Sequence, residues 1–349
     1  MRPLRAGIVG CGVISREYVR TLAPCRQIRL VGAADIQRHR AEDLAESFGG
    51  KAYPTLDAML ADDDVDIIVN LTIQTEHAEV TERGLAAGKH VYSEKPLALS
   101  YAQARELLAL AEHNRVRLSC APMTFLGEAQ QTAWQVIHDG RLGTIRMAYA
   151  DMNWGRPETW HNEPRHYYEV GPLYDIGVYS LTVLTTFFGP ARSATGLGRI
   201  LAGERVTAEG DRFQVTNPDF VVALIEFGNG VVARLTTDFY VGHATKQKGI
   251  EFHGDLGSLW LGNPQHFNAA VQFAPYGGEF EPVPYIRDPY PGTEWSRGLV
   301  ELADAIIDER PHRVTGEHAA HIVEILNAID KGGDVQIRSG FAPPEPLLW

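Results

Sequence analysis

The chain has 349 residues, of which 44% are hydrophobic and 22% are charged, a composition typical of a soluble globular protein with two domains. Its formal net charge of -12 argues against nucleic acid or an anionic membrane as the main partner. No apolar run approaches the roughly 20 residues of a membrane span, and we identify no targeting signal. We therefore expect a cytoplasmic protein without a membrane or nucleic-acid partner.

The first third of the chain alternates between strand patterns and helix patterns. Gly88 is expected to end one helix and Ser100 to cap the next. Strands that alternate with helices of this length predict a parallel sheet with right-handed crossovers. The expected strands are 5–9, 28–34, 66–71, 90–93 and 116–121, and the expected helices are 14–22, 38–48, 77–87 and 101–113.

The pattern changes after about residue 122. Two expected strands, 220–227 and 231–239, flank Asn229-Gly230, a strong hairpin signal. The predicted second domain is α+β, with a large, mostly antiparallel open sheet, so that the two domains are residues 1–122 and 123–349. Its other expected strands are 144–153, 249–253, 257–261 and 267–273, its helices are 125–138, 173–188, 295–309 and 317–329, and residues 343–349 form an extended tail.

A glycine motif, GIVGCGVIS, links the first strand to the first helix. Gly10 allows a tight turn, and Gly12 lets the backbone approach a pyrophosphate bound at the helix N-terminus. Ser15 stands where a third glycine is usual, and it is small enough for helix–strand packing. Strand, glycines, helix and second strand in this order predict an α/β, Rossmann-type domain that binds a dinucleotide.

Asp35 ends the second strand, where an acid can accept hydrogen bonds from the ribose hydroxyls of NAD. Its charge would repel a 2′-phosphate and so favours NAD, whereas Arg38 can offset that repulsion. We predict NAD as the cofactor, with NADP as the alternative. The expected cofactor-binding residues are Gly10, Cys11, Gly12, Val13, Ile14, Asp35, Arg38, Leu71, Thr72, His77, Glu94 and Lys95.

Lys95 lies in YSEKPL, where a buried strand ends. Because Pro96 has no N–H to donate, it ends the strand and holds Lys95 at the carboxyl edge of the sheet, where ligands bind in open α/β folds. Glu94 is expected to brace Lys95 or a backbone amide. His77 is expected either to cap its helix or to line the cofactor cleft.

The segments GIVGCGVIS, DVDIIVNLT and GLAAGKHVYSEKPLALS resemble the glucose–fructose oxidoreductase/inositol dehydrogenase (Gfo/Idh/MocA) family, as does GPLYDIGVYSLTVLTTFFG at residues 171–189. Glu94-Lys95-Pro96 is similar to the family's characteristic motif. The resemblance covers essentially the whole chain. It implies an NAD(P) domain, a homodimer or homotetramer formed through the C-terminal sheet, and oxidation or reduction of a sugar, polyol or sugar derivative.

One position departs from many members of the family, which carry histidine four residues after an aspartate. Here Asp175 is followed by Tyr179, as in the branch that includes glucose–fructose oxidoreductase and dihydrodiol dehydrogenase. Two helical residues with this spacing share one face. A phenol has a reference pKa of about 10, which a nearby lysine ammonium lowers by stabilising the phenolate.

These residues lead to a catalytic hypothesis. Tyr179 takes the substrate proton, Lys95 stabilises and orients the reacting oxygens, and Asp175 hydrogen bonds to the substrate or to Lys95. A version with Lys95 as the direct base remains open.

The segment NWGRPETWHNEPRHYY, residues 153–168, is rich in aromatic, histidine and arginine side chains. Aromatic faces pack on the C–H surfaces of sugars, and Arg, Asn and His donate to hydroxyls, so the segment is a candidate for carbohydrate selection. Its spacing of His161 and His166 differs from the helical zinc motif, and we expect no metal. The candidate substrate-binding residues are Trp154, Arg156, Trp160, His161 and His166, together with Lys95, Asp175 and Tyr179.

The expected function is an NAD(P)-dependent sugar or polyol dehydrogenase acting on CH–OH. One alternative is an NADPH-dependent reductase of a keto-sugar or dicarbonyl compound. A second is a non-catalytic NAD(P)-binding sensor or co-regulator on the same fold, and a third is a lyase or glycosidase that uses bound NAD transiently. The set of Lys95, Asp175 and Tyr179 favours catalysis, because a sensor need not keep it.

Overall fold

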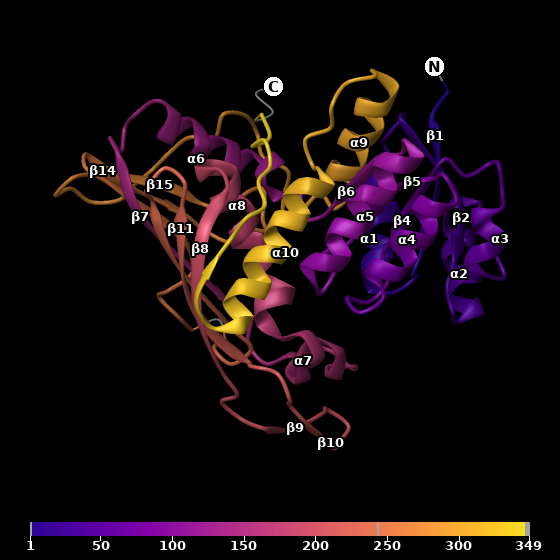
Figure 1. The fold of residues 1–349 in the computed structure, drawn as a ribbon, viewed down its shortest axis with the longest axis horizontal. Helices are drawn as coiled ribbons and strands as arrows, with labels where there is room; N and C mark the ends of the chain where they lie inside the picture. The colour runs from indigo at the N-terminus through magenta and orange to yellow at the C-terminus, as the bar shows by residue number, and fades with distance from the viewer. Residues whose placement is uncertain (1, 243, 346–349) are drawn as a thin grey trace. The chain divides into compact units, whose positions relative to one another are not determined.

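A computed structural model describes residues 2–242 and 244–345, which form two compact units (Figure 1). The first unit contains the chain up to Met123 and also Glu294–Val323. The second contains Thr124–Thr293 and the chain from Glu324 onward. The chain thus returns to the first unit near its end. The division into a cofactor domain before residue 123 and a substrate domain after it stays a prediction.

The first unit is built on a six-stranded parallel sheet with the strand order β3-β2-β1-β4-β5-β6. The predicted Rossmann-type sheet is therefore confirmed. Its strand order reverses between β1 and β4, and such a switch point is where open α/β sheets bind ligands. The strands are β1 (Leu4–Val9), β2 (Ile28–Ala34), β3 (Lys51–Ala52), β4 (Ile67–Asn70), β5 (His90–Ser93) and β6 (Leu118–Cys120).

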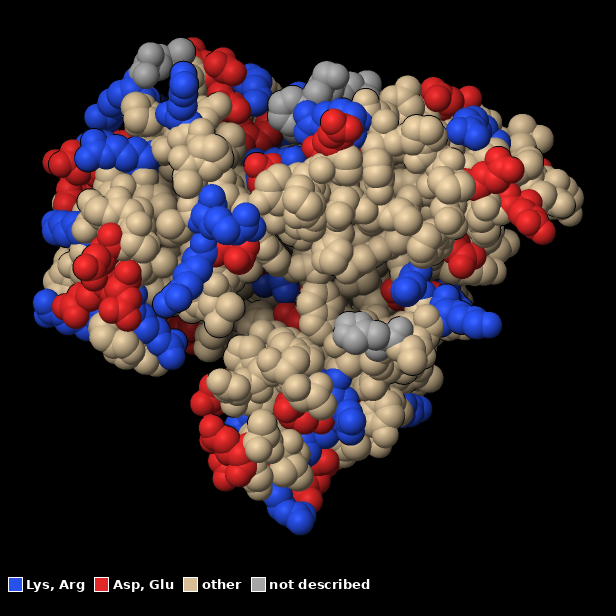
Figure 2. Space-filling view, turned by 180° about the vertical axis from the view of Figure 1, so that it is seen from behind, with Lys and Arg blue, Asp and Glu red and all other residues tan. Residues whose placement is uncertain are grey.

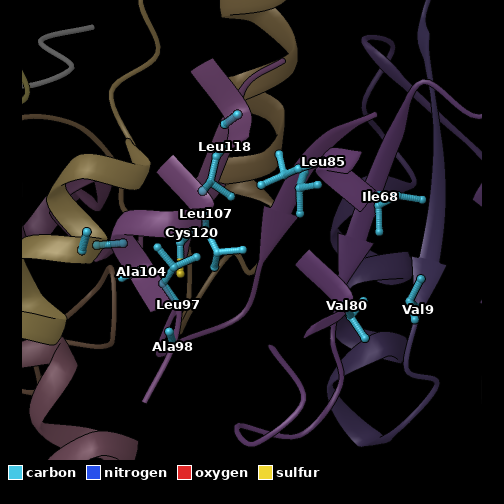
Figure 3. Close-up of a cluster of buried hydrophobic side chains, with 14 of the residues drawn as sticks. Val9, Ile68, Val80, Leu85, Leu97, Ala98, Ala104, Leu107, Leu118 and Cys120 are labelled. Atoms are coloured by element: carbon cyan, nitrogen blue, oxygen red, sulfur yellow. The ribbon is translucent and has the colours of Figure 1, made fainter. Parts of the chain in front are cut away.

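Helices bury both faces of this sheet. Successive residues of β4 and β5 point to opposite faces. Ile68 (Figure 3) and Val91 pack with residues of α4, α5 and the start of α10, whereas Ile67 and Tyr92 pack with residues of α1, α2 and α9. The helices are α1 (Val13–Leu22), α2 (Arg38–Phe48), α3 (Leu56–Leu60), α4 (His77–Ala86), α5 (Tyr101–Asn114), α9 (Arg297–Ile307) and α10 (Gly316–Lys331). The hydroxyl of Ser100 accepts the N–H of Gln103 at 3.2 Å, which confirms the predicted cap of α5.

The second unit contains a nine-stranded sheet with the order β16-β15-β14-β13-β7-β12-β11-β8-β17. Among the strands in the described residues of this sheet, only the pair β7–β12 is parallel, so the prediction of a mostly antiparallel sheet is confirmed. The strands are β7 (Ile145–Asn153), β8 (Ala191–Arg199), β11 (Phe220–Phe227), β12 (Val232–Asp238), β13 (Gly249–Gly254), β14 (Gly257–Leu261), β15 (Val271–Pro275), β16 (Glu281–Pro282) and β17 (Gly333–Gln336). A separate hairpin consists of β9 (Glu204–Val206) and β10 (Arg212–Gln214).

Two of the expected helices in this unit are divided. Gly127 has extended backbone and separates the 3-10 turn η1 (Thr124–Leu126) from α6 (Glu128–His138). The predicted helix 173–188 consists of a π-helical turn, η3 (Leu173–Gly177), followed by helix α8 (Val178–Phe188). The turn η2 (Pro157–Thr159) and helix α7 (Arg165–Pro172) lie between β7 and η3 in the chain.

The large sheet has one covered and one open face. Helix α6 contacts β14 and β15, and α8 contacts β7. Along the central strands buried residues alternate with exposed ones, which is the pattern of a sheet with one face uncovered. The uncovered face carries large apolar side chains, namely Met147, Tyr149, Leu197, Leu224 and Val232.

Three observations concern the surface, the helices and the end of the chain. In the view of Figure 2, basic and acidic side chains are interspersed on the first unit, and a broad area of the second unit carries few charges. None of the helices in the described residues is both long and apolar enough to cross a bilayer. The tail expected at 343–349 lies partly outside the described residues, which end at 345.

Candidate active site

The glycine motif forms a tight turn at the carboxyl end of β1. Gly10 has φ +89°, and a Cβ there would lie 2.6 Å from the carbonyl oxygen of Leu71, so only glycine fits between the two loops. Gly12 precedes α1 without a side-chain cap, and nothing lies within 4 Å of the position of a Cβ. Buried Ser15 donates its hydroxyl hydrogen to the Gly12 carbonyl at 2.6 Å. The N-terminal amides of α1 are therefore arranged as a pyrophosphate site requires.

The Asp35 carboxylate is held by backbone amides. Oδ2 accepts the N–H of Cys11 and Oδ1 that of Gln37, each at 2.7 Å. Each carboxylate oxygen has a second lone pair, which leaves acceptor capacity for ribose hydroxyls. Arg38 is exposed and pairs with Glu42 at 2.8 Å. Burial, with Asp35 as the second cause, raises the pKa of the Cys11 thiol to about 12, so the thiol stays protonated in the loop.

His77, the first residue of α4, braces two loops. Its Nδ1 lies 2.8 Å from the carbonyl oxygen of Pro96, and its Nε2 lies 3.0 Å from that of Thr72. Burial lowers the pKa of the ring, against the opposing effects of these carbonyls and of Glu94. The expected helix cap is wrong, because the ring contacts these carbonyls and Glu76 occupies the cap position without a side-chain bond.

Glu94 is nearly buried and both of its oxygens are engaged. The Tyr18 hydroxyl donates to Oε1 at 2.7 Å, and the backbone N–H of Lys95 donates to Oε2 at 3.2 Å. Burial, followed by the charge of Glu94, raises the pKa of Tyr18, so this phenol stays protonated as a donor. The sequence pattern missed Tyr18. Lys95 itself is half-buried, and its peptide bond to Pro96 is cis.

In the second unit, Tyr179 lies in the first turn of α8 and Asp175 lies in the π-helical turn before it. Both are buried, with exposed fractions of 4% and 5%. Trp154 lies nearly parallel to the Tyr179 ring, with centroids 6.5 Å apart and 15° between the planes. The side-chain amide of Gln265 donates to the Tyr179 hydroxyl at 3.5 Å. π-helical turns are frequent at functional sites, and this one positions the candidate acid–base pair.

The segment 153–168 places four rings in contact. His161 packs against His166 at a centroid distance of 5.1 Å, and Tyr167 packs against His166 at 4.1 Å and against Trp160 at 5.2 Å. Burial, with His161 as the second cause, lowers the pKa of His166, and the Nδ1 of His161 accepts the N–H of Glu163 at 2.9 Å. A His166 ring with a lowered pKa is a neutral donor at neutral pH. Among residues 2–242 and 244–345, no group of three or more His, Cys, Asp or Glu side chains is arranged to hold a metal.

The sequence-predicted residues therefore form two groups, one in each unit. At the carboxyl edge of the parallel sheet lie Gly10 to Ile14, Asp35, Arg38, Leu71, Thr72, His77, Glu94 and Lys95. Beside α8 lie Asp175, Tyr179 and Trp154, while Trp160, His161 and His166 form the ring cluster. Arg156 is exposed and precedes η2. Sequence patterns missed Gln265, because it lies in an irregular loop without a motif.

Comparison with known proteins agrees with this architecture. Residues 4–121 match an oxidoreductase family with an NAD-binding Rossmann fold, and residues 130–260 match the GFO/IDH/MocA C-terminal domain. A dTDP-3,4-didehydro-2,6-dideoxy-alpha-D-glucose 3-reductase from Actinomadura kijaniata is 31% identical over 262 residues, which cover 74% of each chain.

Two further similarities extend this result. A trans-1,2-dihydrobenzene-1,2-diol dehydrogenase from Mus musculus is 27% identical over 241 residues, covering 67% of this chain and 68% of the relative. A 3-ketoreductase from Actinomadura kijaniata, solved with NADP, has the same fold with a TM-score of 0.76 and 24% identity, covering 95% of this chain and 97% of that one. From its two matched domains and its relatives, the chain belongs to the Gfo/Idh/MocA family and is an NAD(P)-dependent oxidoreductase.

Proposed function

We propose that this oxidoreductase interconverts a hydroxyl and a carbonyl group on a sugar, polyol or sugar derivative. The observation that carries the proposal is the near-parallel Trp154 ring beside the Tyr179 phenol, in the same unit as a cluster of aromatic and histidine side chains. Aromatic faces suit the C–H surface of a sugar, and imidazole nitrogens suit its hydroxyls. The relatives are a reductase of a dTDP-linked sugar derivative and a diol dehydrogenase, and these activities agree with the proposed substrate class.

The first unit offers the residues that would hold the cofactor. The amides after Gly12 receive the pyrophosphate, Asp35 accepts from the ribose hydroxyls, and Leu71 and Thr72 border the glycine turn. The nicotinamide supplies or accepts the hydride when the cofactor is bound. The charge of Asp35 disfavours a 2′-phosphate, so we propose NAD as the preferred form and NADP as a weaker one.

The second unit offers the proton acceptor. In the oxidative direction the Tyr179 oxygen takes the substrate hydroxyl proton, and the charge of Lys95 favours the phenolate. The amide of Gln265 donates to the Tyr179 oxygen and orients it, and Asp175 hydrogen bonds to the substrate or to Lys95. In the reductive direction the phenol returns the proton. Trp154, Arg156, Trp160, His161 and His166 are proposed to contact the substrate.

A substrate screen tests the proposal. Aldoses, polyols, uronates and anhydrosugars are incubated with NAD+ or NADP+, and keto-sugars and dicarbonyls with NADH or NADPH, while absorbance at the reduced-nicotinamide band is followed. We expect turnover of at least one sugar or polyol, faster with NAD+ than with NADP+. Turnover restricted to carbonyl substrates with NADPH would favour the reductase alternative. Tight cofactor binding without turnover of any compound would support a sensor, and product formation without net NADH would support transient NAD chemistry.

The open face of the large sheet is proposed to form a homodimer or homotetramer interface. Leu224, on β11, is 52% exposed on this face and lies between Arg234 of β12 and Thr195 of β8. Large exposed apolar side chains on an open sheet face favour association with another copy. Leu224→Lys should therefore shift the sedimentation coefficient towards that of the monomer. Tyr276→Lys, at an exposed turn after β15, is the matched control and should leave the assembly intact.

A further inference from the structure

Arg205, on β9 of the small hairpin, is buried among polar groups, two of which come from other segments. Its guanidinium donates to Oε1 of Glu158 at 3.3 Å, to Oδ2 of Asp219, and through Nε to the carbonyl of Ala202 at 3.3 Å. Arg205 is 5% exposed and Asp219 is fully buried. One arginine thus meets two carboxylates and a backbone carbonyl, and the directions of its N–H groups fix where all three lie.

Two aromatic rings enclose the same guanidinium. Its carbon lies 5.4 Å from the centroid of the Tyr168 ring and 5.3 Å from that of the Tyr240 ring. The Tyr168 hydroxyl also donates to Oε2 of Glu158 at 2.5 Å. Glu158 therefore joins the arginine and the phenol, and the loop after β12 contributes Tyr240 to the cluster.

In the sequence, Glu158 precedes the ring cluster and Tyr168 follows it. Glu158 belongs to η2 and Tyr168 to α7, so the hydrogen bond between them closes the stretch 159–167, and Arg205 of the remote hairpin contacts both residues. The stretch contains three of the proposed substrate-binding residues, Trp160, His161 and His166.

We propose that Arg205 is a positioning residue that fixes the shape of segment 153–168 and thereby sets which sugar is accepted. The inference rests on the proposed function, because it takes this segment as the carbohydrate-binding element. Buried ion pairs often add little net stability compared with apolar packing, whereas a guanidinium fork imposes direction on its acceptors. A cluster of this kind is therefore better suited to fixing geometry than to stabilising the fold.

Kinetics of Arg205→Lys test this role, because lysine keeps the charge and loses the planar fork. With the best sugar from the screen, KM should rise about tenfold or more, kcat should change by less than about threefold, and the order of preference among sugars should change. The KM for NAD(P) should stay at the wild-type value. Arg212→Lys is the matched control, since Arg212 lies on the same hairpin and forms an exposed pair with Glu204. Wild-type KM and sugar preference in Arg205→Lys overturn the inference.

Amide hydrogen exchange provides a readout that needs no substrate and so separates this inference from the proposed function. In Arg205→Lys, exchange should accelerate in peptides from residues 153–168 and stay unchanged in β11 and β12. Glu158→Gln keeps an acceptor and loses the charge, and it should give the same pattern with a smaller change. Unchanged exchange in 153–168 overturns the inference. Faster exchange throughout the second unit also overturns the inference, because this result would mean that Arg205 stabilises the whole unit rather than the segment 153–168.

Discussion

Replacing Tyr179 by phenylalanine should lower kcat about 10²- to 10⁴-fold and leave the KM values for sugar and NAD(P) close to wild-type. The substitution removes the oxygen that we propose takes the substrate proton, and it keeps the ring that lies beside Trp154. Lys95→Met should lower kcat to a similar degree, because in the proposed mechanism the lysine charge stabilises the phenolate. The rates are measured from NADH absorbance at saturating sugar and cofactor, on the substrate found in the screen.

Tyr174→Phe is the matched control for these variants. The Tyr174 hydroxyl accepts from the side-chain amide of Asn327 at 2.9 Å, and burial raises its pKa to about 12, so it is suited to a structural bond. This variant should keep wild-type kcat. Near-normal turnover in Tyr179→Phe together with lost turnover in Lys95→Met would assign the proton step to Lys95. Near-normal turnover in both variants would contradict the proposed mechanism.

Acid should destabilise the first unit through His318 of α10. Burial, with His321 as the second cause, lowers the pKa of His318 to about 3, so the folded protein keeps this ring neutral between that pH and the unfolded pKa of about 6.5. The unfolded chain binds the extra proton throughout this window. The contribution of the neutral ring to stability is therefore fully present above pH 6.5 and is lost as the pH falls. Between pH 7 and 4.5 the loss is about 3 kcal/mol.

Urea unfolding at pH 7 and at pH 4.5 measures this effect. In His318→Gln the free energy of unfolding should fall with pH by about 3 kcal/mol less than in the wild type, because the variant has no proton to bind at this position. Burial also lowers the pKa of His77, His90 and His312 in this unit, but none of these rings contributes to the lowered pKa of His318, and their contributions cancel in the comparison. His39→Gln, on the exposed side of α2, is the control and should follow the wild type. An equal pH dependence in His318→Gln would refute the assignment.

Local sequence patterns predicted the first unit well, because its strands are buried on both faces and its helices carry clear end signals. Strands 28–34 and 90–93 and helix 38–48 have the predicted bounds. The strand β8 escaped prediction. Gly196 interrupts its pattern, and a Cβ at this position would lie 2.3 Å from the carbonyl oxygen of Ile329 in α10. Close packing between segments far apart in the sequence thus requires a residue that disfavours strands in isolation.

The residues of the candidate site also fall into two classes, those that a local motif indicates and those that only tertiary contacts reveal. The glycine turn, Asp35 and Lys95 belong to short motifs whose chemistry can be recognised locally. Tyr18 and Gln265 carry no such motif. Tyr18 bonds to Glu94 across 76 positions, and Gln265 bonds to Tyr179 across 86. Their roles depend on tertiary contacts, and no pattern in their immediate neighbourhood indicates them.

Because the chain returns to the first unit after the second, chimeras of related enzymes cannot be made by exchanging a single continuous segment. Leu299 and Leu302 of α9 are fully buried against the parallel sheet, although they follow the second unit in the sequence. A fragment that stops at Met123 would keep α1 and α2 but would expose the part of that sheet face that α9 covers, and the exposed apolar surface would favour aggregation. A chimera that exchanges nucleotide specificity between two such enzymes therefore needs three crossover junctions, at 123/124, 293/294 and 323/324, rather than a single splice.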